Sequence, residues 1–149
     1  MTVQAENKKA HFNYTILETL EAGLVLSGPE VKSIKLGHVS IRESFVTFKG
    51  KDAYLTNTQI TPYSHARLPP DYDPAQPRKL LLHKKEIDYL RGKSQQKGLT
   101  IVPLKVYTKN QLIKVQIAVA QGKHTYNKKE TLKKRDLERE YKRTLKTYR

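Results

Sequence analysis

Apolar and polar residues alternate most regularly in the last strands before the basic C-terminal segment. Between Leu112 and Ala120, one side holds Ile113, Val115, Ile117 and Val119, and the other holds Leu112, Lys114, Gln116 and Ala118. This period of two predicts a strand with one buried face and one wetter, basic face. A second apolar run, Leu99–Tyr107, precedes it, and a turn at Thr108–Gln111 joins the two as an antiparallel hairpin.

Shorter stretches upstream have the same period. Phe12–Leu20 is rich in β-forming residues and predicts a first strand. Ser44–Phe48 and Ala53–Leu55 flank a glycine-containing turn and predict a second hairpin. Gln59 and Ile60 continue as a further short strand.

The stretch Glu21–Ser33 predicts a strand that turns into a helix. Gly23 permits a bend in an apolar run, and Ser27 and Gly28 end the strand. Pro29 suits the first helical turn, where Glu30 complements the positive helix end. Gly37 stands where a C-terminal cap is expected.

Prolines separate this half of the chain from the next. Five of them crowd the segment 62–77 and predict a long surface loop. Arg78–Leu82 then runs two cations into three leucines, of which at least one must face the surface if the segment is a strand. His83–Lys93 has helical spacing and ends near Gly92.

These elements predict a mainly β protein. Five or six short strands with antiparallel hairpins favour an OB-like closed antiparallel β-barrel with two or three short accessory helices, and a sandwich is the alternative. We expect residues 1–121 to form this barrel, with 1–10 as a flexible lead-in, and residues 122–149 to form a basic tail.

Charge points to the class of partner. The 149 residues have a net charge of +15 and a pI near 9.9, which favours a polyanion: nucleic acid first, an anionic membrane second. No apolar run approaches the about 20 residues needed to span a bilayer, and no secretory signal core is present. We therefore expect a cytoplasmic protein without a membrane partner. The absence of cysteine excludes disulfides and thiolate chemistry.

The tail concentrates this charge. From Gly122 onward it holds eleven lysines and arginines against four acidic residues. Leu137, Tyr141, Leu145 and Tyr148 recur at helical spacing but form a thin stripe. We expect a tail that is disordered when free and helical when a polyanion neutralises it; the alternative is a solvated tail that aids only solubility.

Catalytic chemistry is not indicated. The five histidines have no metal-ligand spacing, no glycine-rich phosphate loop occurs, and Asp71 with Asp73 is a weak magnesium signal. We expect no enzyme activity, cofactor or metal. Aromatic residues interleaved with cations instead suit stacking on unpaired bases: Tyr14, Phe45, Tyr54, Tyr63, Tyr107 and Tyr126. Composition leaves RNA and DNA open, as well as sequence-independent single-strand binding.

A series of ordered motifs extends over nearly the whole chain. It comprises Asn7-Lys8-Lys9-Ala10, Tyr14, Glu21-Ala22-Gly23-Leu24, Gly28, Glu30-Val31-Lys32-Ser33, Gly37, Ser44-Phe45, Pro62-Tyr63, Asp73-Pro74, Arg78-Lys79-Leu80-Leu81-Leu82, Glu86-Ile87, Gly98, Pro103-Leu104 and Gly122-Lys123. This series resembles the small protein B family, the SsrA-binding proteins of bacteria. The chain departs from the lysine, aspartate and arginine usual in that family at His124, Asn127 and Lys129.

The resemblance implies an OB-like RNA-binding protein, a monomer without enzyme activity. Its implied partners are transfer-messenger RNA, the stalled 70S ribosome and, through the RNA, elongation factor Tu. The implied RNA-binding positions are Asn7, Lys8, Lys9, Tyr14, Glu21, Lys32, Arg78, Lys79 and Leu81. The implied decoding-site and tail positions are Lys123, His124, Tyr126, Asn127, Lys128, Lys129, Leu137 and Leu145.

Overall fold

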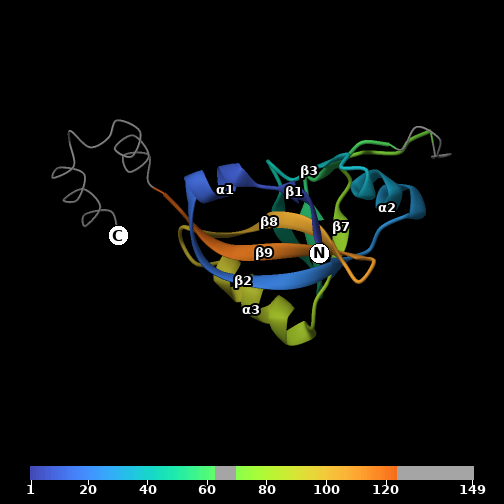
Figure 1. Cartoon of the computed structure of the whole chain (residues 1–149). Helices are drawn as coiled ribbons and strands as arrows, with labels where there is room; N and C mark the ends of the chain where they lie inside the picture. The colour runs from blue at the N-terminus through green and yellow to red at the C-terminus, as the bar shows by residue number, and fades with distance from the viewer. Residues whose placement is uncertain (63–69, 124–149) are drawn as a thin grey trace, which may run out of the picture.

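The computed structural model of the chain describes residues 1–62 and 70–123 (Figure 1). Its elements, in chain order, are β1 (Thr2–Glu6), α1 (Lys8–Asn13), β2 (Tyr14–Leu24), α2 (Gly28–Lys35), β3 (Val39–Ser40), β4 (Phe45–Lys49), β5 (Asp52–Thr56), β6 (Gln59–Ile60), β7 (Arg78–Leu81), α3 (Lys84–Ser94), β8 (Leu99–Lys109) and β9 (Leu112–Gly122). The structure thus confirms a mainly β chain with a few short helices. None of the described helices has both the length and the apolar character that a bilayer crossing requires.

An antiparallel sheet of seven strands forms the centre of the molecule, in the order β1-β8-β9-β2-β7-β5-β4. A separate pair, β3 and β6, lies beside it. The predicted hairpin of β8 and β9 is confirmed, and its turn residues Asn110 and Gln111 have φ values of 52° and 66°. Positive φ at both central residues matches the right-handed twist of the strands, which is why this turn closes a tight hairpin.

The expected closure into a barrel is not found. The strand order has two ends, β1 and β4, and no strand pairing joins them within the described ranges. The sheet nevertheless curls, since β4 lies in contact with β8 without pairing to it.

The inner face of the sheet carries the main core. From β9 it receives Ile113, Val115, Ile117 and Val119. Helix α3 adds Ile87 and Leu90, and α2 adds Ile34, so both helices bury their apolar side against this face. Removing these side chains from water is the main favourable term in the fold.

The outer face is covered only in part, by α1. Ala10 of α1 packs on a small cluster of buried residues, Val102, Leu104, Ala118 and Ala120. Helices α1 and α3 therefore lie on opposite sides of β2, β8 and β9, as Figure 1 shows. The prediction of one wet face on β9 holds for Lys114 and Gln116, whereas Ala118 is covered by α1.

The N-terminal ten residues are not a flexible lead-in. They form β1, which pairs with β8, and the start of α1. Phe12 belongs to this helix, so the first predicted strand begins later, at Tyr14, and continues to Leu24. Asn7 explains the helix, because its side chain accepts a hydrogen bond from the Ala10 N–H (3.1 Å) at the helix N-terminus.

The strand-to-helix junction is confirmed. Ser27 caps α2 by accepting from the Glu30 N–H (3.3 Å), while Glu30 accepts from the Ser27 N–H (3.2 Å). Gly37 ends the segment with a φ of 82°. Much of the tail prediction, and part of the proline-loop prediction, lies outside the described residues.

Candidate nucleic-acid interface

The uncovered part of the outer sheet face brings together side chains from four strands. Residues opposite each other in an antiparallel sheet share a face. Gly23 of β2 lies opposite Leu81 of β7 and Lys114 of β9, and Lys114 lies opposite Tyr107 of β8. Together with Glu21 and Lys79, two residues along their strands, these side chains define what we call the sheet-face patch.

Leu81 is the exposed leucine that the sequence requires. In β7, Leu80 is buried and Leu81 is 53% exposed, because successive side chains point to opposite faces. Leu81 lies over Gly23: a Cβ at Gly23 would stand 3.3 Å from both Cβ and Cδ1 of Leu81. Because Gly23 has no side chain, Leu81 can lie directly against the backbone of β2.

Glu21 is held from one side. The Tyr107 hydroxyl donates to its Oε2, and Lys109 Nζ stands 3.6 Å from the same oxygen. Its Oε1 makes no hydrogen bond within residues 1–62 and 70–123. A carboxylate fixed by one oxygen and open at the other can accept a hydrogen bond from a base edge or a 2′-hydroxyl.

The charge state of this pair is set by the same contact. The hydrogen bond from Tyr107 is the largest influence and lowers the pKa of Glu21; desolvation opposes it, and the charges of Lys109 and Lys114 lower the pKa further. Burial and the bond to Glu21 raise the pKa of Tyr107 well above the usual tyrosine range. Glu21 is therefore an acceptor and Tyr107 a donor at neutral pH.

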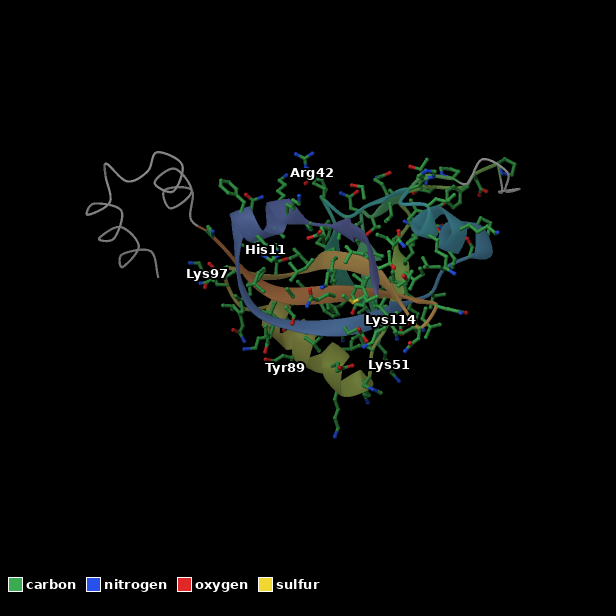
Figure 2. All side chains as sticks on the ribbon, viewed as in Figure 1. His11, Arg42, Lys51, Tyr89, Lys97 and Lys114 are labelled. Carbon is green, nitrogen blue, oxygen red and sulfur yellow. The ribbon has the colours of Figure 1, made fainter. Side chains whose placement is uncertain are left out.

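Lysines surround the patch. Lys79 Nζ lies 3.5 Å from Asp52, and Lys105 Nζ lies 5.6 Å from the centre of the Tyr107 ring. Lys114 forms no ion pair in the described part of the chain, and Figure 2 shows where it leaves the sheet. In such an arrangement the lysines can bind the phosphates of a nucleic acid while Leu81 and Glu21 contact its bases or sugars.

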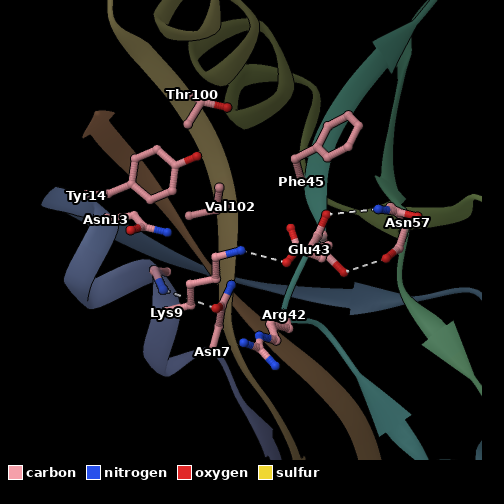
Figure 3. A pocket seen from close by; sticks show the side chains of 12 residues that line it. Asn7, Lys9, Asn13, Tyr14, Arg42, Glu43, Phe45, Asn57, Thr100 and Val102 are labelled. Carbon is pink, nitrogen blue, oxygen red and sulfur yellow. Dashed lines mark hydrogen bonds and ion pairs between the residues drawn. The ribbon is translucent and has the colours of Figure 1, made fainter. Parts of the chain in front are cut away.

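A second concave region, the α1 pocket, lies where α1 meets the start of β4 (Figure 3). It has a volume of about 410 Å³. Its lining residues are Asn7, Lys9, Ala10, Asn13, Tyr14, Arg42, Glu43, Ser44, Phe45, Asn57, Thr100 and Val102. A neighbouring open groove adds Lys8 and Phe12 on the other side of α1.

Two predicted RNA-binding residues, the N-cap of α1 and a residue of its first turn, have partners inside the chain. Asn7 is buried, and its amide donates to the backbone oxygens of Ile41 (3.2 Å) and Pro103 (3.0 Å). Lys9 forms an exposed ion pair with Glu43 (2.6 Å). The hydrogen bond and the charge of Lys9 lower the pKa of the Glu43 carboxyl. Asn7 thus positions α1, whereas Lys9 remains within reach of solvent.

Arg78 does not face the surface. It is 3% exposed, and its guanidinium donates to Glu30 Oε2 from Nε (3.1 Å) and Nη2 (2.5 Å). Nη1 donates to the backbone oxygens of Thr58 (2.7 Å) and Pro74 (2.9 Å). This arginine joins α2, the residue before β6 and Pro74 of the proline loop, so its place in the fold is that of a buried structural residue.

The remaining predicted positions are spread over the molecule. Lys8 is exposed on α1, and Lys32 is exposed on α2, away from the sheet-face patch. The Lys123 N–H donates to the Asn13 backbone oxygen (3.0 Å), so the chain leaves β9 beside α1. His124, Tyr126, Asn127, Lys128, Lys129, Leu137 and Leu145 lie outside the described residues.

Sequence reasoning missed Lys114 as a site residue, and it offered Tyr107 only as a ring for base stacking, not as the hydrogen-bond donor to Glu21. The alternation in β9 placed Lys114 on the wet face, and the β8–β9 register then adds Tyr107. No sequence pattern indicated that Arg42 lies at a binding site, because it belongs to no strand or helix. No cluster of three potential metal-ligating side chains occurs in the described ranges.

Comparison with known proteins identifies the family. The SmpB protein family matches residues 4–147. An SsrA-binding protein of Ligilactobacillus salivarius (strain UCC118) is 50% identical over 144 residues, which is 97% of this chain and 92% of that protein. Another from Persephonella marina (strain DSM 14350 / EX-H1) is 53% identical over 138 residues, covering 93% of this chain and 90% of the relative.

A solved structure supports the same assignment. A chain from "tmRNA-SmpB: a journey to the center of the bacterial ribosome" superposes with a TM-score of 0.69 at 44% identity. The match covers 85% of this chain and 92% of that chain. In sequence and in fold, therefore, the chain belongs to the SmpB family.

Proposed function

We propose that this chain binds the tRNA-like part of transfer-messenger RNA and delivers it to stalled ribosomes for trans-translation. The relatives are named SsrA-binding proteins, and the solved neighbour is described with transfer-messenger RNA and the bacterial ribosome. The observation that carries the proposal for this chain is the sheet-face patch, where Leu81 and a one-sidedly held Glu21 stand among lysines.

In this proposal the sheet-face patch recognises the folded shape of the RNA through packing and hydrogen bonds. Leu81 packs on a base or sugar, and Oε1 of Glu21 accepts from a base edge or a 2′-hydroxyl. Lys79 and Lys114 follow the phosphates, and they supply affinity rather than specificity. No step of bond making or breaking is needed, so the protein acts as a binding factor and not as an enzyme.

The finer architecture belongs to the same proposal. Contact between β4 and β8 supports an OB-like curl of the sheet. We assign RNA capture to the region before residue 122, and entry into the decoding site and the empty messenger channel to residues 122–149. Elongation factor Tu would be met through the RNA. A ribosomal partner implies a cytoplasmic site of action.

The proposal is tested by binding of transfer-messenger RNA over a range of salt. We expect Leu81→Asp to weaken binding by about tenfold or more, equivalent to about 1.4 kcal/mol, because it places a negative charge against RNA. Tyr107→Phe removes the hydroxyl that holds Glu21 and should weaken RNA binding, but less than Leu81→Asp does. Glu21→Gln should also weaken binding.

Leu36→Asp is the matched control, because Leu36 is 56% exposed at the end of α2, away from the patch. It should bind RNA like the unaltered chain. Equal binding by the Leu81→Asp and Leu36→Asp chains would show that the patch is not the interface. Equal competition by polypyrimidine DNA and by transfer-messenger RNA would favour a sequence-independent single-strand binder instead.

A further inference from the structure

The α1 pocket has aromatic side chains on two walls. Tyr14, at the start of β2, and Phe45, at the start of β4, lie on opposite sides of it in Figure 3. Phe45 is 40% exposed, although it is a large apolar side chain. The volume of about 410 Å³ lies in the range of about 300–1,000 Å³ that is usual for small-molecule sites.

Both walls are fixed before any ligand arrives. On the β4 side, the Asn57 amide donates to the Glu43 backbone oxygen (3.2 Å), and the Ser44 hydroxyl bonds the Thr58 hydroxyl (2.7 Å). On the α1 side, the buried amide of Asn7 ties the helix to Ile41 and Pro103. A ligand that enters therefore orders little of the protein, which lowers the entropic cost of binding.

Polar groups without partners line the space between the walls. The Asn13 amide, the Tyr14 hydroxyl and the Thr100 hydroxyl make no hydrogen bond within the described ranges, yet all three residues line the pocket. They offer donors and acceptors, as the edge of a nucleobase requires.

Cations stand beside the same space. Lys9 and Glu43 form their ion pair between α1 and the β4 side, with side chains 42% and 61% exposed. An exposed pair of this kind contributes little, so Lys9 can exchange Glu43 for a phosphate at small cost. Arg42 adds a second cation that has no ion pair in the described part of the chain.

We propose that the α1 pocket binds one unpaired nucleobase of RNA, stacked on Phe45, with its edge toward Asn13 and Thr100 and its phosphate near Lys9 and Arg42. This inference rests on the proposed RNA-binding function and gives the chain a second RNA contact, separate from the sheet-face patch. Paired bases do not fit the proposal, because their edges and faces are already occupied in a duplex.

The chain contains no tryptophan, which makes a direct test possible. Phe45→Trp keeps a planar ring in the wall and introduces a single strong fluorophore, whose emission a stacked base quenches. Tyr89→Trp is the matched reporter: Tyr89 is 46% exposed on α3, on the side of the sheet opposite α1 and away from Arg42 (Figure 2).

Each full-length reporter is titrated separately with transfer-messenger RNA, with purified ribosomes and with a blunt RNA duplex. Quenching at position 45 but not at 89 by transfer-messenger RNA assigns the base to that RNA, and quenching by ribosomes alone assigns it to ribosomal RNA. Both results support the proposal. No quenching at position 45 with either partner, or equal quenching at 45 by the duplex, overturns it.

A second variant separates ring stacking from apolar volume. Phe45→Leu should weaken binding of the RNA that quenches the reporter by about tenfold, which is 1.4 kcal/mol, while Phe45→Trp keeps it. Equal binding by both variants overturns the stacking role. If RNA still binds and responds to Leu81→Asp while position 45 is silent, only this inference fails and the proposed function stands.

Discussion

Two adjacent cations show how strongly a single strand position decides the role of a residue. Arg78 and Lys79 follow each other in β7, and both were predicted to bind RNA. Because side chains alternate across a strand, Arg78 points inward to Glu30, whereas Lys79 stays exposed beside Asp52. The buried pair is completed by hydrogen bonds from Tyr72 and Gln76 to Glu30.

The pKa of Glu30 follows from this surrounding. Burial by itself raises it, but the hydrogen bonds from Arg78 and from the Ser27 N–H, together with the charge of Arg78, outweigh burial and hold the pKa below the ordinary value. A lowered folded pKa means that the ionised carboxylate stabilises the fold above the ordinary pKa of about 4.3. That contribution is lost as pH falls through the lower folded pKa.

Arg78→Met should destabilise the fold by about 3–5 kcal/mol at pH 7, because it leaves Glu30 charged and unpaired in the interior. In this variant burial acts unopposed by the guanidinium, so protonation of Glu30 should recover part of the loss as pH falls toward 5. Denaturant unfolding at both pH values measures this. Lys79→Met is the control, since its exposed ion pair is worth about 0–1 kcal/mol. Equal losses in both variants would contradict the structural role of Arg78.

At the scale of elements, the pairing of β2 with β7 places Leu81 opposite Gly23. Gly23 is buried between strands and has Leu81 directly above it, whereas Gly92 in α3 has no atom within 4 Å of where a Cβ would stand. Substitution by alanine is therefore expected to affect RNA binding at Gly23 and not at Gly92.

Gly23→Ala should weaken RNA binding several-fold, because the new Cβ stands 3.3 Å from Leu81 and that side chain must shift by a few tenths of an ångström to make room. Gly92→Ala should leave binding unchanged and stabilise the helix by up to about 1 kcal/mol. RNA titration and thermal unfolding of both variants measure this. In a Leu81→Ala background the effect of Gly23→Ala should vanish; if it persists, the glycine acts by another route.

At the scale of the whole molecule, the sheet region and the basic tail meet at a defined point. Strand β9 continues to Gly122, and the Lys123 N–H bonds Asn13 at the end of α1. The chain therefore leaves β9 beside α1 (Figure 1), and Asn13, which holds Lys123, also lines the α1 pocket. A cut before this point removes part of the sheet as well as the tail.

Truncation after Lys123 should leave affinity for transfer-messenger RNA within about tenfold, a change of 1.4 kcal/mol or less, because the sheet-face patch remains intact. It should abolish peptide tagging on stalled ribosomes, because the segment proposed for the messenger channel is gone. Filter binding and a tagging assay with the same protein measure both. Parallel loss of the two activities would contradict the division of labour between sheet and tail.

Local chemistry was sufficient for much of the fold. The β8–β9 hairpin, the β4–β5 hairpin, the capped helix after Ser27 and the exposed leucine of β7 were all predicted, because each depends on neighbours in the chain. Motif resemblance predicted the family. The order of strands was not accessible, since pairs such as β1 with β8 join residues about a hundred positions apart.

What the sequence determined by itself was most of the elements after Tyr14, the basic charge and the polar face of β9, because propensity, capping and period are local properties. What only the tertiary structure decided was which polar residues remain available. It buried Asn7 and Arg78, held Glu21 by one oxygen through Tyr107, and faced Tyr14 with Phe45 across a pocket. These outcomes depend on long-range packing. Whether a polar side chain is buried and paired or remains exposed depends on residues distant in the chain, which local sequence does not reveal.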